Sequence, residues 1–340
     1  MATSGMTSYG DISQRTAAWV AATMLEHADP ILVLSKFGLM KEVPQNTAES
    51  VKFRRPVPFT AAITPLVEGV TPTAQKMQYE DIAATLKQYG APVEITDKVA
   101  DVNEDPVLQD AATLAGEQAG ETIEVLTWGM ISGGTNVFYA GTSDASRTDV
   151  NDPVSLGRQR LITRFLKAQK ARQIALRIGP SDGQGTEPVA ASYVALGHTD
   201  LESDIRNMTG FVPVEKYGSY KPTCPQEIGK VEDVRYVLTP HMSPWEGAGS
   251  GTLNGMKSVG GSKVDVYPII FVGRGAYGLV ALSGNRDIEP MVLNPGKPSK
   301  SDPLGQRGYV SWKTYFTAVR LNEAWMVRLE CGVTSNPTGT

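Results

Sequence analysis

The sequence predicts an α+β fold in which an extended two-stranded arm and one long helix accompany strand-rich segments. Two observations support this prediction. Residues 51–63 alternate apolar and polar side chains, which is typical of a strand, and residues 105–133 carry one long helical pattern. An extended arm beside a long helix indicates a subunit that contacts neighbouring copies.

The composition limits the class of protein. A chain of 340 residues with 41% apolar side chains can bury a substantial core in one large domain or two smaller ones. The net charge of −4 provides no overall attraction to nucleic acid. Cys224 and Cys331 lie too far apart to indicate a disulfide framework. No apolar run approaches the roughly 18 residues of a membrane span, and no secretion signal is visible at the start.

The extended arm has an exposed character. Pro56 and Pro58 lack an N–H group, which excludes a central strand and favours an edge. A hairpin with so little core needs a packing partner, which is either its own domain or a neighbouring subunit. We take Phe53, Arg54, Arg55 and Phe59 as candidate inter-subunit contacts, with the two arginines pairing acidic groups across that contact.

The long helix has clear end signals. Asp105 can cap the first N–H groups, Pro106 suits the first helical position, and Gly133 suits the stop. Alanines at spacings of three and four residues predict a narrow apolar face that another element approaches closely. Residues 79–89 before this helix are predicted as a short helix, and residues 91–102 as a strand.

A second helix, opening at residues 151–153, is basic. It carries Arg158, Arg164 and Lys167, and no acidic residue follows until after Ser181. Such a face either is solvated with local ion pairs or meets acidic neighbours or packaged nucleic acid. These three residues are therefore candidate contacts to a genome.

The C-terminal half is strand-rich. Residues 245–261 are rich in glycine and serine and are predicted as a mobile surface loop. Residues 309–333 contain two apolar strands, and Asn322 and Glu323 between them indicate a hairpin turn.

Catalytic signals are weak. Gly273, Gly275 and Gly278 match a dinucleotide-binding pattern, but a strand pattern follows where a helix is required. The three histidines have no metal-ligand spacing, and His198 is expected to cap a helix start. We therefore predict no catalytic residue, cofactor or metal. An α/β enzyme with a site near residues 179–185 or 273–278 stays as an alternative.

Three segments carry a resemblance to a known family. They read QYGAPVEITD at 88–97, QEIGKVEDVRYVLTP at 226–240 and PLGQRGYVSWKTYFTAVRLNEAWMVRLE at 303–330. With the order of elements, they resemble the N4-gp56 family of bacteriophage major capsid proteins, which have the HK97-type fold. The resemblance implies an N-terminal arm (1–50), an extended loop (51–80), a peripheral domain (81–187) with a spine helix (105–133), an axial domain (188–303) and strands that return to the peripheral domain (304–340).

The resemblance also implies a function. Hexamers and pentamers of the chain would close into an icosahedral head around double-stranded DNA, which they would contact without sequence preference. Portal, scaffolding and decoration proteins would be further partners, with scaffold as a separate chain and no membrane involved. The protein would assemble in the host cytoplasm and reside in the virion. A phage tail or decoration protein is the remaining alternative.

Overall fold

A computed structural model shows the arrangement of the chain. It describes residues 26, 28, 31–44, 48–57, 59–63, 65, 68–69, 71, 74–98, 107–174, 191–218, 221–282, 288–293 and 303–336. Most of the predicted N-terminal arm, together with Asp105, Pro106 and the loop at 179–185, lies outside these residues.

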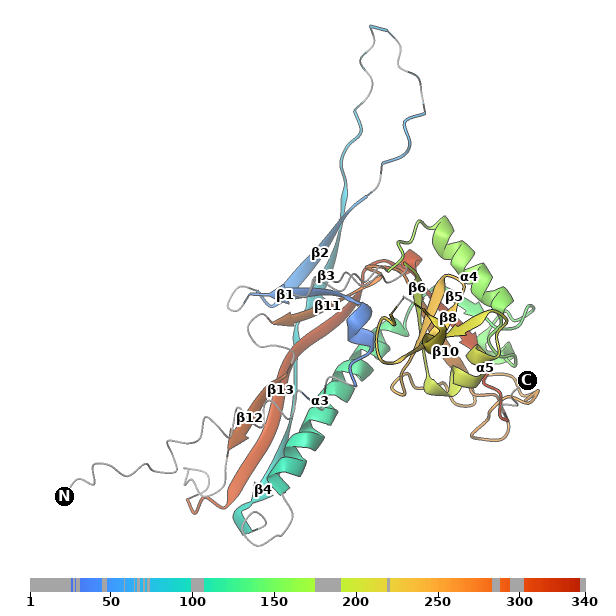
Figure 1. The fold of residues 1–340 in the computed structure, drawn as a ribbon. Coiled ribbons are helices and arrows are strands. Elements are labelled where there is room, and N and C mark those ends of the chain that lie inside the picture. Colours follow the sequence, from blue (N-terminus) through green and yellow to red (C-terminus); the bar gives the residue numbers. More distant parts are fainter. Residues whose placement is uncertain are drawn as a thin grey trace, which may run out of the picture.

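The described residues form two bodies and a projecting hairpin (Figure 1). One body is elongated and consists of a long helix beside a five-stranded sheet, and the other is a more rounded α/β unit at the C-terminal end of that helix. The hairpin extends away from the junction of the two bodies. The molecule therefore presents a large surface for its length.

The elongated body is built on its longest strand, β13. This strand pairs antiparallel with β4 along one edge and with β12 and β11 in succession along the other, while β1 pairs parallel with β11. The elements of this body are η2 (Leu34–Phe37), β1 (Leu39–Val43), β4 (Lys87–Thr96), α3 (Val107–Ile131), β11 (Tyr277–Leu282), β12 (Glu289–Leu293) and β13 (Arg307–Arg320).

Small side chains allow α3 to lie close to the sheet. Ala112, Ala115 and Ala119 are fully or almost fully buried in the first core, as the alanine spacing predicts. Alternate residues of β13 face the same core, and Trp312 Nε1 donates to Gln118 Oε1 on α3 at 3.1 Å. The predicted spine helix is thus confirmed over Val107–Ile131.

The rounded body has a seven-stranded mixed sheet in the order β5-β14-β10-β6-β9-β8-β7. Its second core lies between this sheet and the helices α4 and α5. The central strands β6, β9 and β10 are buried throughout. Its elements are β5 (Val137–Tyr139), α4 (Leu156–Ala168), β6 (Tyr193–Gly197), α5 (Glu202–Arg206), β7 (Phe211–Pro213), β8 (Glu227–Val231), β9 (Val234–Leu238), β10 (Tyr267–Val272) and β14 (Met326–Cys331).

A buried carboxylate joins the two bodies. Glu330 on β14 has no exposed surface and accepts two hydrogen bonds of 2.7 Å from Arg147 and one of 2.8 Å from Arg328. Arg328 also donates to the carbonyl oxygens of Ser132 and Gly134, directly after the end of α3. The C-terminus of the helix is thereby tied to the seven-stranded sheet.

A second buried carboxylate holds the segment before β1 against the helix. Glu124 on α3 accepts hydrogen bonds from the N–H groups of Val33 at 2.8 Å and Leu34 at 2.9 Å. The hydroxyl of Tyr277 donates to the carbonyl oxygen of Leu34, so both the N–H and the carbonyl of Leu34 are hydrogen-bonded to side chains of this body. Burial raises the pKa of Glu124 to about 7, and the backbone donors offset part of that effect.

Two predicted local structures are wrong. Residues 79–89 are not a short helix but the strand β3 (Tyr79–Thr85) and the start of β4. Ala84 and Leu86, two positions apart as on one face of a strand, are both buried in a third small core. Asn322 and Glu323 do not form a hairpin turn. Asn322 instead caps the short helix η6 (Glu323–Trp325), which leads from β13 in one sheet to β14 in the other.

The loop at 245–261 also differs from its prediction as a mobile segment. Asp265, which is fully buried, accepts hydrogen bonds of 2.8 Å from the N–H groups of Gly247 and Val259. Backbone bridges pair Trp245 with Val266 and Met256 with Thr334. The loop is therefore fastened to the second body at several points.

The two bodies are discontinuous along the sequence. The predicted division at residue 187 assigns α4 to the same unit as the spine helix, but α4 packs into the second core. The predicted axial segment includes β11 and β12, which pair with β13 in the elongated body. Within the described part of the chain, no helix is both long enough and apolar enough to cross a membrane.

Replacing Glu330 by alanine tests the junction between the bodies. Arg147 and Arg328 would lose their shared carboxylate, and we expect the free energy of unfolding to fall by about 3 kcal/mol. Urea unfolding followed by tryptophan fluorescence measures this change. Arg160→Ala, which removes the exposed ion pair with Glu232, is the control and should have a far smaller effect. Equal effects of the two variants would contradict the role of Glu330.

The raised pKa of Glu124 predicts a pH dependence. In the unfolded chain this carboxyl has its ordinary pKa of 4.5, whereas in the folded protein it holds its proton up to about pH 7. Its contribution to stability is thus fully present below pH 4.5 and is lost as the pH rises through 7. We expect Glu124→Gln to reduce the difference between the melting temperatures at pH 5 and pH 8, and an unchanged difference would refute this assignment.

Candidate inter-subunit surfaces

The projecting hairpin begins as a regular antiparallel pair. Strand β2 (Ser50–Pro56) pairs with β3 from Ser50–Thr85 to Pro56–Tyr79, and the N–H of Val57 donates to the carbonyl of Gln78 at 2.9 Å. Beyond this point the described residues continue away from both bodies (Figure 1). The predicted extended two-stranded arm is therefore present, with little core of its own.

Both candidate arginines are paired within the hairpin. Arg54 forms hydrogen bonds of 2.8 and 2.9 Å with Asp81, which lies directly opposite it, and Arg55 pairs in the same way with Glu80. The hydrogen bond from Arg54 lowers the pKa of the Asp81 carboxyl. These exposed cross-strand pairs fix the register of β2 against β3. In the single subunit the arginines thus already have acidic partners.

The two candidate phenylalanines have different surroundings. Phe53 is 9% exposed and lies in the third core with Val43, Ala84, Leu86 and Val280. Its ring lies so close to Gly278 that a Cβ at that position would be 2.9 Å from Phe53 Cζ. Phe53 is therefore a core residue of its own subunit in this structure.

Phe59, in contrast, is 58% exposed. It belongs to a set of apolar side chains along the outer part of the hairpin that the subunit itself leaves uncovered. The set consists of Val57, Phe59, Ile63, Met77 and Tyr79. Exposed apolar side chains gathered on a projecting element are typical of an interaction surface.

The basic helix has fewer open charges than its sequence indicates. Its N-cap is Ser155, and Arg158 donates to the carbonyl oxygens of Ala140 and Gly141. Lys167 forms an ion pair of 2.5 Å with Asp233. Arg164 is exposed and has no ion pair among the described residues. Of the three candidate genome contacts, Arg164 therefore keeps its charge most open.

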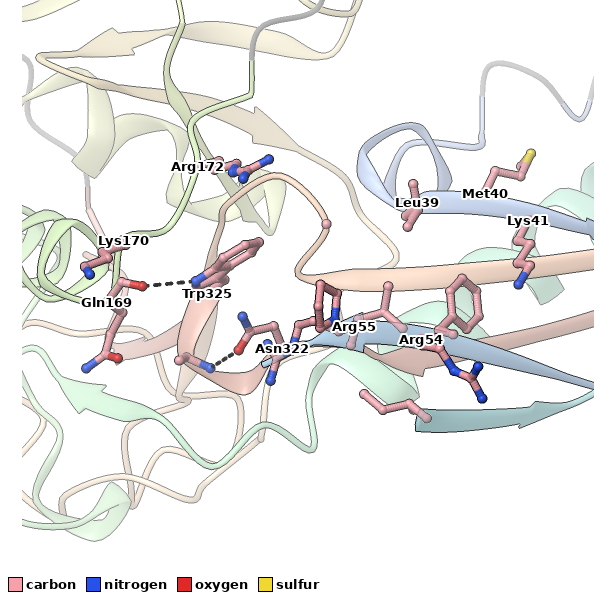
Figure 2. Close-up of a pocket in the computed structure, with 16 residues that line it drawn as sticks. Leu39, Met40, Lys41, Arg54, Arg55, Gln169, Lys170, Arg172, Asn322 and Trp325 are labelled. Carbon is pink, nitrogen blue, oxygen red and sulfur yellow. Dashed lines mark hydrogen bonds between the residues drawn. The ribbon is translucent and has the colours of Figure 1, made fainter. Parts of the chain in front are cut away.

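A groove lies between the hairpin base and the rounded body (Figure 2). It has a volume of about 1020 Å³ and is bounded by β1, β2, the residues after α4 and the segment around η6. Leu39 and Met40 of β1 line it and are about half exposed. Figure 2 shows Lys41, Arg172 and Trp325 among the groups around the same space.

Sequence reasoning did not find this groove. Lys170 and Arg172 continue the basic run of α4, and that run was the available signal. Their proximity to β1 depends on contacts between segments more than 100 residues apart in sequence, as Leu39 and Gly275 illustrate by lining the same space. No local pattern predicts such a meeting.

The enzymatic alternative finds no support at the glycine pattern. Gly273 and Gly275 lie in the turn between β10 and β11, and Gly278 already belongs to β11, so a strand and not a helix N-terminus follows the turn. His198 accepts a hydrogen bond of 3.0 Å from the N–H of Asp200 and caps a short helix, as predicted. Among the described residues, no cluster of three His, Cys, Asp or Glu side chains is placed to hold a metal.

Comparisons with known proteins define the class. A family model described as "Phage capsid protein" matches residues 79–327, which is more than half of the chain. The chain therefore belongs to this family of phage capsid proteins, and it is a structural protein rather than an enzyme.

A curated relative is the major capsid protein of Pseudomonas phage KPP21. It is 24% identical over 154 residues, which cover 43% of this chain and 38% of the relative. This match thus spans well under half of the length of that protein.

Solved structures show the same fold. The capsid of Ralstonia phage GP4 matches with a TM-score of 0.67 at 12% identity and covers 91% of both chains. The capsid of cyanophage Pam1 matches with a TM-score of 0.60 at 12% identity and covers 99% of this chain and 96% of that chain. The predicted HK97-like α+β fold is confirmed.

The contrast between the two phenylalanines is testable in dissociated subunits. We expect Phe53→Ala to lower the free energy of unfolding by about 3 kcal/mol, because it leaves a cavity in the third core. Phe59→Ala should change the free energy of unfolding by less than about 0.5 kcal/mol, because removal of an exposed ring creates no cavity. Urea titrations at concentrations below assembly measure both values. A larger loss for Phe59 would show that its ring is buried within the subunit.

Proposed function

We propose that this chain is the major capsid protein of a bacteriophage and that its copies close into an icosahedral head around double-stranded DNA. The family supports the capsid role. The observation that carries the proposal is the projecting hairpin, whose exposed apolar side chains Phe59 and Ile63 have no cover within the subunit. A second copy is the partner that a self-assembling shell always supplies.

The hairpin acts by lying over an adjacent subunit. Each copy gives its hairpin and receives another, which is a heterologous contact that generates closed rings of six and five. Burial of the ring of Phe59 contributes about 2 kcal/mol per contact, and ordering of the hairpin offsets part of this gain. Repetition of many such modest contacts makes the shell stable while single subunits stay soluble.

The two bodies take the roles of the two capsid domains. The elongated body with α3 and β13 is the peripheral domain, and the rounded body with α4 and the seven-stranded sheet is the axial domain at the capsomer centre. The segments 226–240 and 303–330 contain β8, β9, β13 and most of β14, and each of these strands has neighbours on both sides in its sheet. On these segments we place the chain in the N4-gp56 group of capsid proteins.

The remaining partners follow from the same role. Arg164, with Arg158 and Lys167 beside it on α4, is the proposed contact to packaged DNA, through phosphates and without sequence preference. Portal, scaffolding and decoration proteins are the further partners of such a head. Assembly takes place in the host cytoplasm, and the mature protein is part of the virion.

Acidic residues on the outer hairpin test the proposal. The double variant Phe59→Asp with Ile63→Asp places a charge at each apolar contact, so we expect its subunits to stay small and folded. Sedimentation velocity distinguishes megadalton particles from single subunits. The matched control is Thr60→Asp with Gln78→Asp, which adds the same charge to the same hairpin at exposed polar positions. Particles of normal size and yield from the first variant would contradict the role of the hairpin.

A further inference from the structure

The groove at the hairpin base is basic as well as apolar. Among its lining residues there are five Lys or Arg side chains and no Asp or Glu. Arg54 and Arg55 are neutralised by their pairs with Asp81 and Glu80. The side chains of Lys170 and Arg172 are exposed and have no ion pair within the described part of the chain. The open positive charge thus lies on the side of the groove near the end of α4.

The apolar part of the groove faces these cations. Leu39 is 51% exposed and Met40 is 49% exposed, although both belong to a strand whose neighbour β11 is almost entirely buried. Lys41 stands beside them over the ring of Phe53, 5.3 Å from its centroid. An occupant that suits this surface needs both carboxylates and apolar side chains.

The outer face of α3 has this composition. The helix carries four carboxylates and no Lys or Arg over its 25 residues, and all of these carboxylates except Glu124 are exposed. Leu114 is 63% exposed and Val125 is 49% exposed on the same face. The acidic stripe, as we name it, consists of Asp110, Leu114, Glu117, Glu121 and Val125. Their spacing of three and four residues aligns them over about 22 Å.

We propose that the groove of one subunit receives the acidic stripe of α3 from a second copy. The proposal rests on the proposed self-assembly and identifies one of its contacts. Both surfaces are exposed in the same subunit, and no residue of α3 lines the groove. The two surfaces therefore meet only between copies, in a heterologous contact that extends from subunit to subunit around a ring.

Charge complementarity favours the acidic stripe over two other occupants, the outer hairpin of a second copy and a nucleic acid. The outer part of the hairpin carries one acidic and one basic residue, Glu68 and Lys76, and so has no net charge to match the groove. A nucleic acid backbone would satisfy the cations but would leave Leu39 and Met40 without an apolar partner. The acidic stripe complements both parts. Such ion pairs determine register and association rate, and salt weakens them.

Charge reversal on each side tests the contact. The groove variant is Lys170→Glu with Arg172→Glu, the stripe variant is Asp110→Lys with Glu121→Lys, and the combined variant carries all four changes. Lys216→Glu with Lys263→Glu is the control, because both lysines are exposed outside the groove and the change in charge equals that of the groove variant. Circular dichroism and melting temperatures first establish that each subunit folds.

We expect the groove variant and the stripe variant each to lower the yield of particles at least about tenfold, because like charges then face each other. The combined variant should restore the yield to that of the control, because its charges are again complementary. If the groove variant fails to fold, Lys170→Gln with Arg172→Gln replaces it and should shift assembly to higher protein concentration.

The outcomes separate this proposal from the proposed function. Failure of the wild-type chain to form any particle would refute self-assembly itself. If the wild type assembles and the groove variant assembles as the control does, the groove is not a contact. If the groove variant fails and the combined variant does not recover, the occupant is not the acidic stripe, and the proposal is overturned while the capsid function stands.

Discussion

The placement of the spine helix relative to the seven-stranded sheet depends on one buried carboxylate, Glu330. Two arginines converge on it, and one of these, Arg328, also binds the carbonyl oxygens that follow α3. Trp245 packs under both guanidinium groups and against Trp128 of the helix. Because Glu330 is fully buried and Arg328 is largely buried, the junction resists rearrangement more than an exposed ion pair does. The angle between the two bodies is therefore a property of the single subunit.

The hairpin and the groove have the opposite character. The subunit leaves Phe59 and Ile63 exposed on the hairpin and Leu39 and Met40 exposed at its base. A rigid frame that carries incomplete surfaces suits a protein whose copies complete each other, because the frame sets the geometry and the surfaces supply many modest contacts. The inner end of the hairpin belongs to the frame, since Phe53 packs with Val280 of β11 in the third core.

Local sequence patterns predicted the elements that local physics determines. The alanine spacing predicted the buried face of α3, the prolines predicted an exposed arm, and His198 caps a helix as expected. The strand predicted after the glycine pattern at 273–278 is present as β11. The predictions failed where distant segments meet. Phe53 is buried because Gly278, on a strand 225 residues later, leaves room for its ring. Residues 79–89 form strands because β2 and β13 pair with them.

The most direct test of the central claim is cryo-electron microscopy of the purified wild-type chain under conditions that favour assembly. Our account predicts closed shells in which the hairpin of each subunit crosses its neighbour while the two bodies keep the relative orientation of the isolated subunit. The account would be contradicted by compact monomers that form no particles at any concentration and whose hairpin is folded back, so that Phe59 and Ile63 are buried against their own subunit.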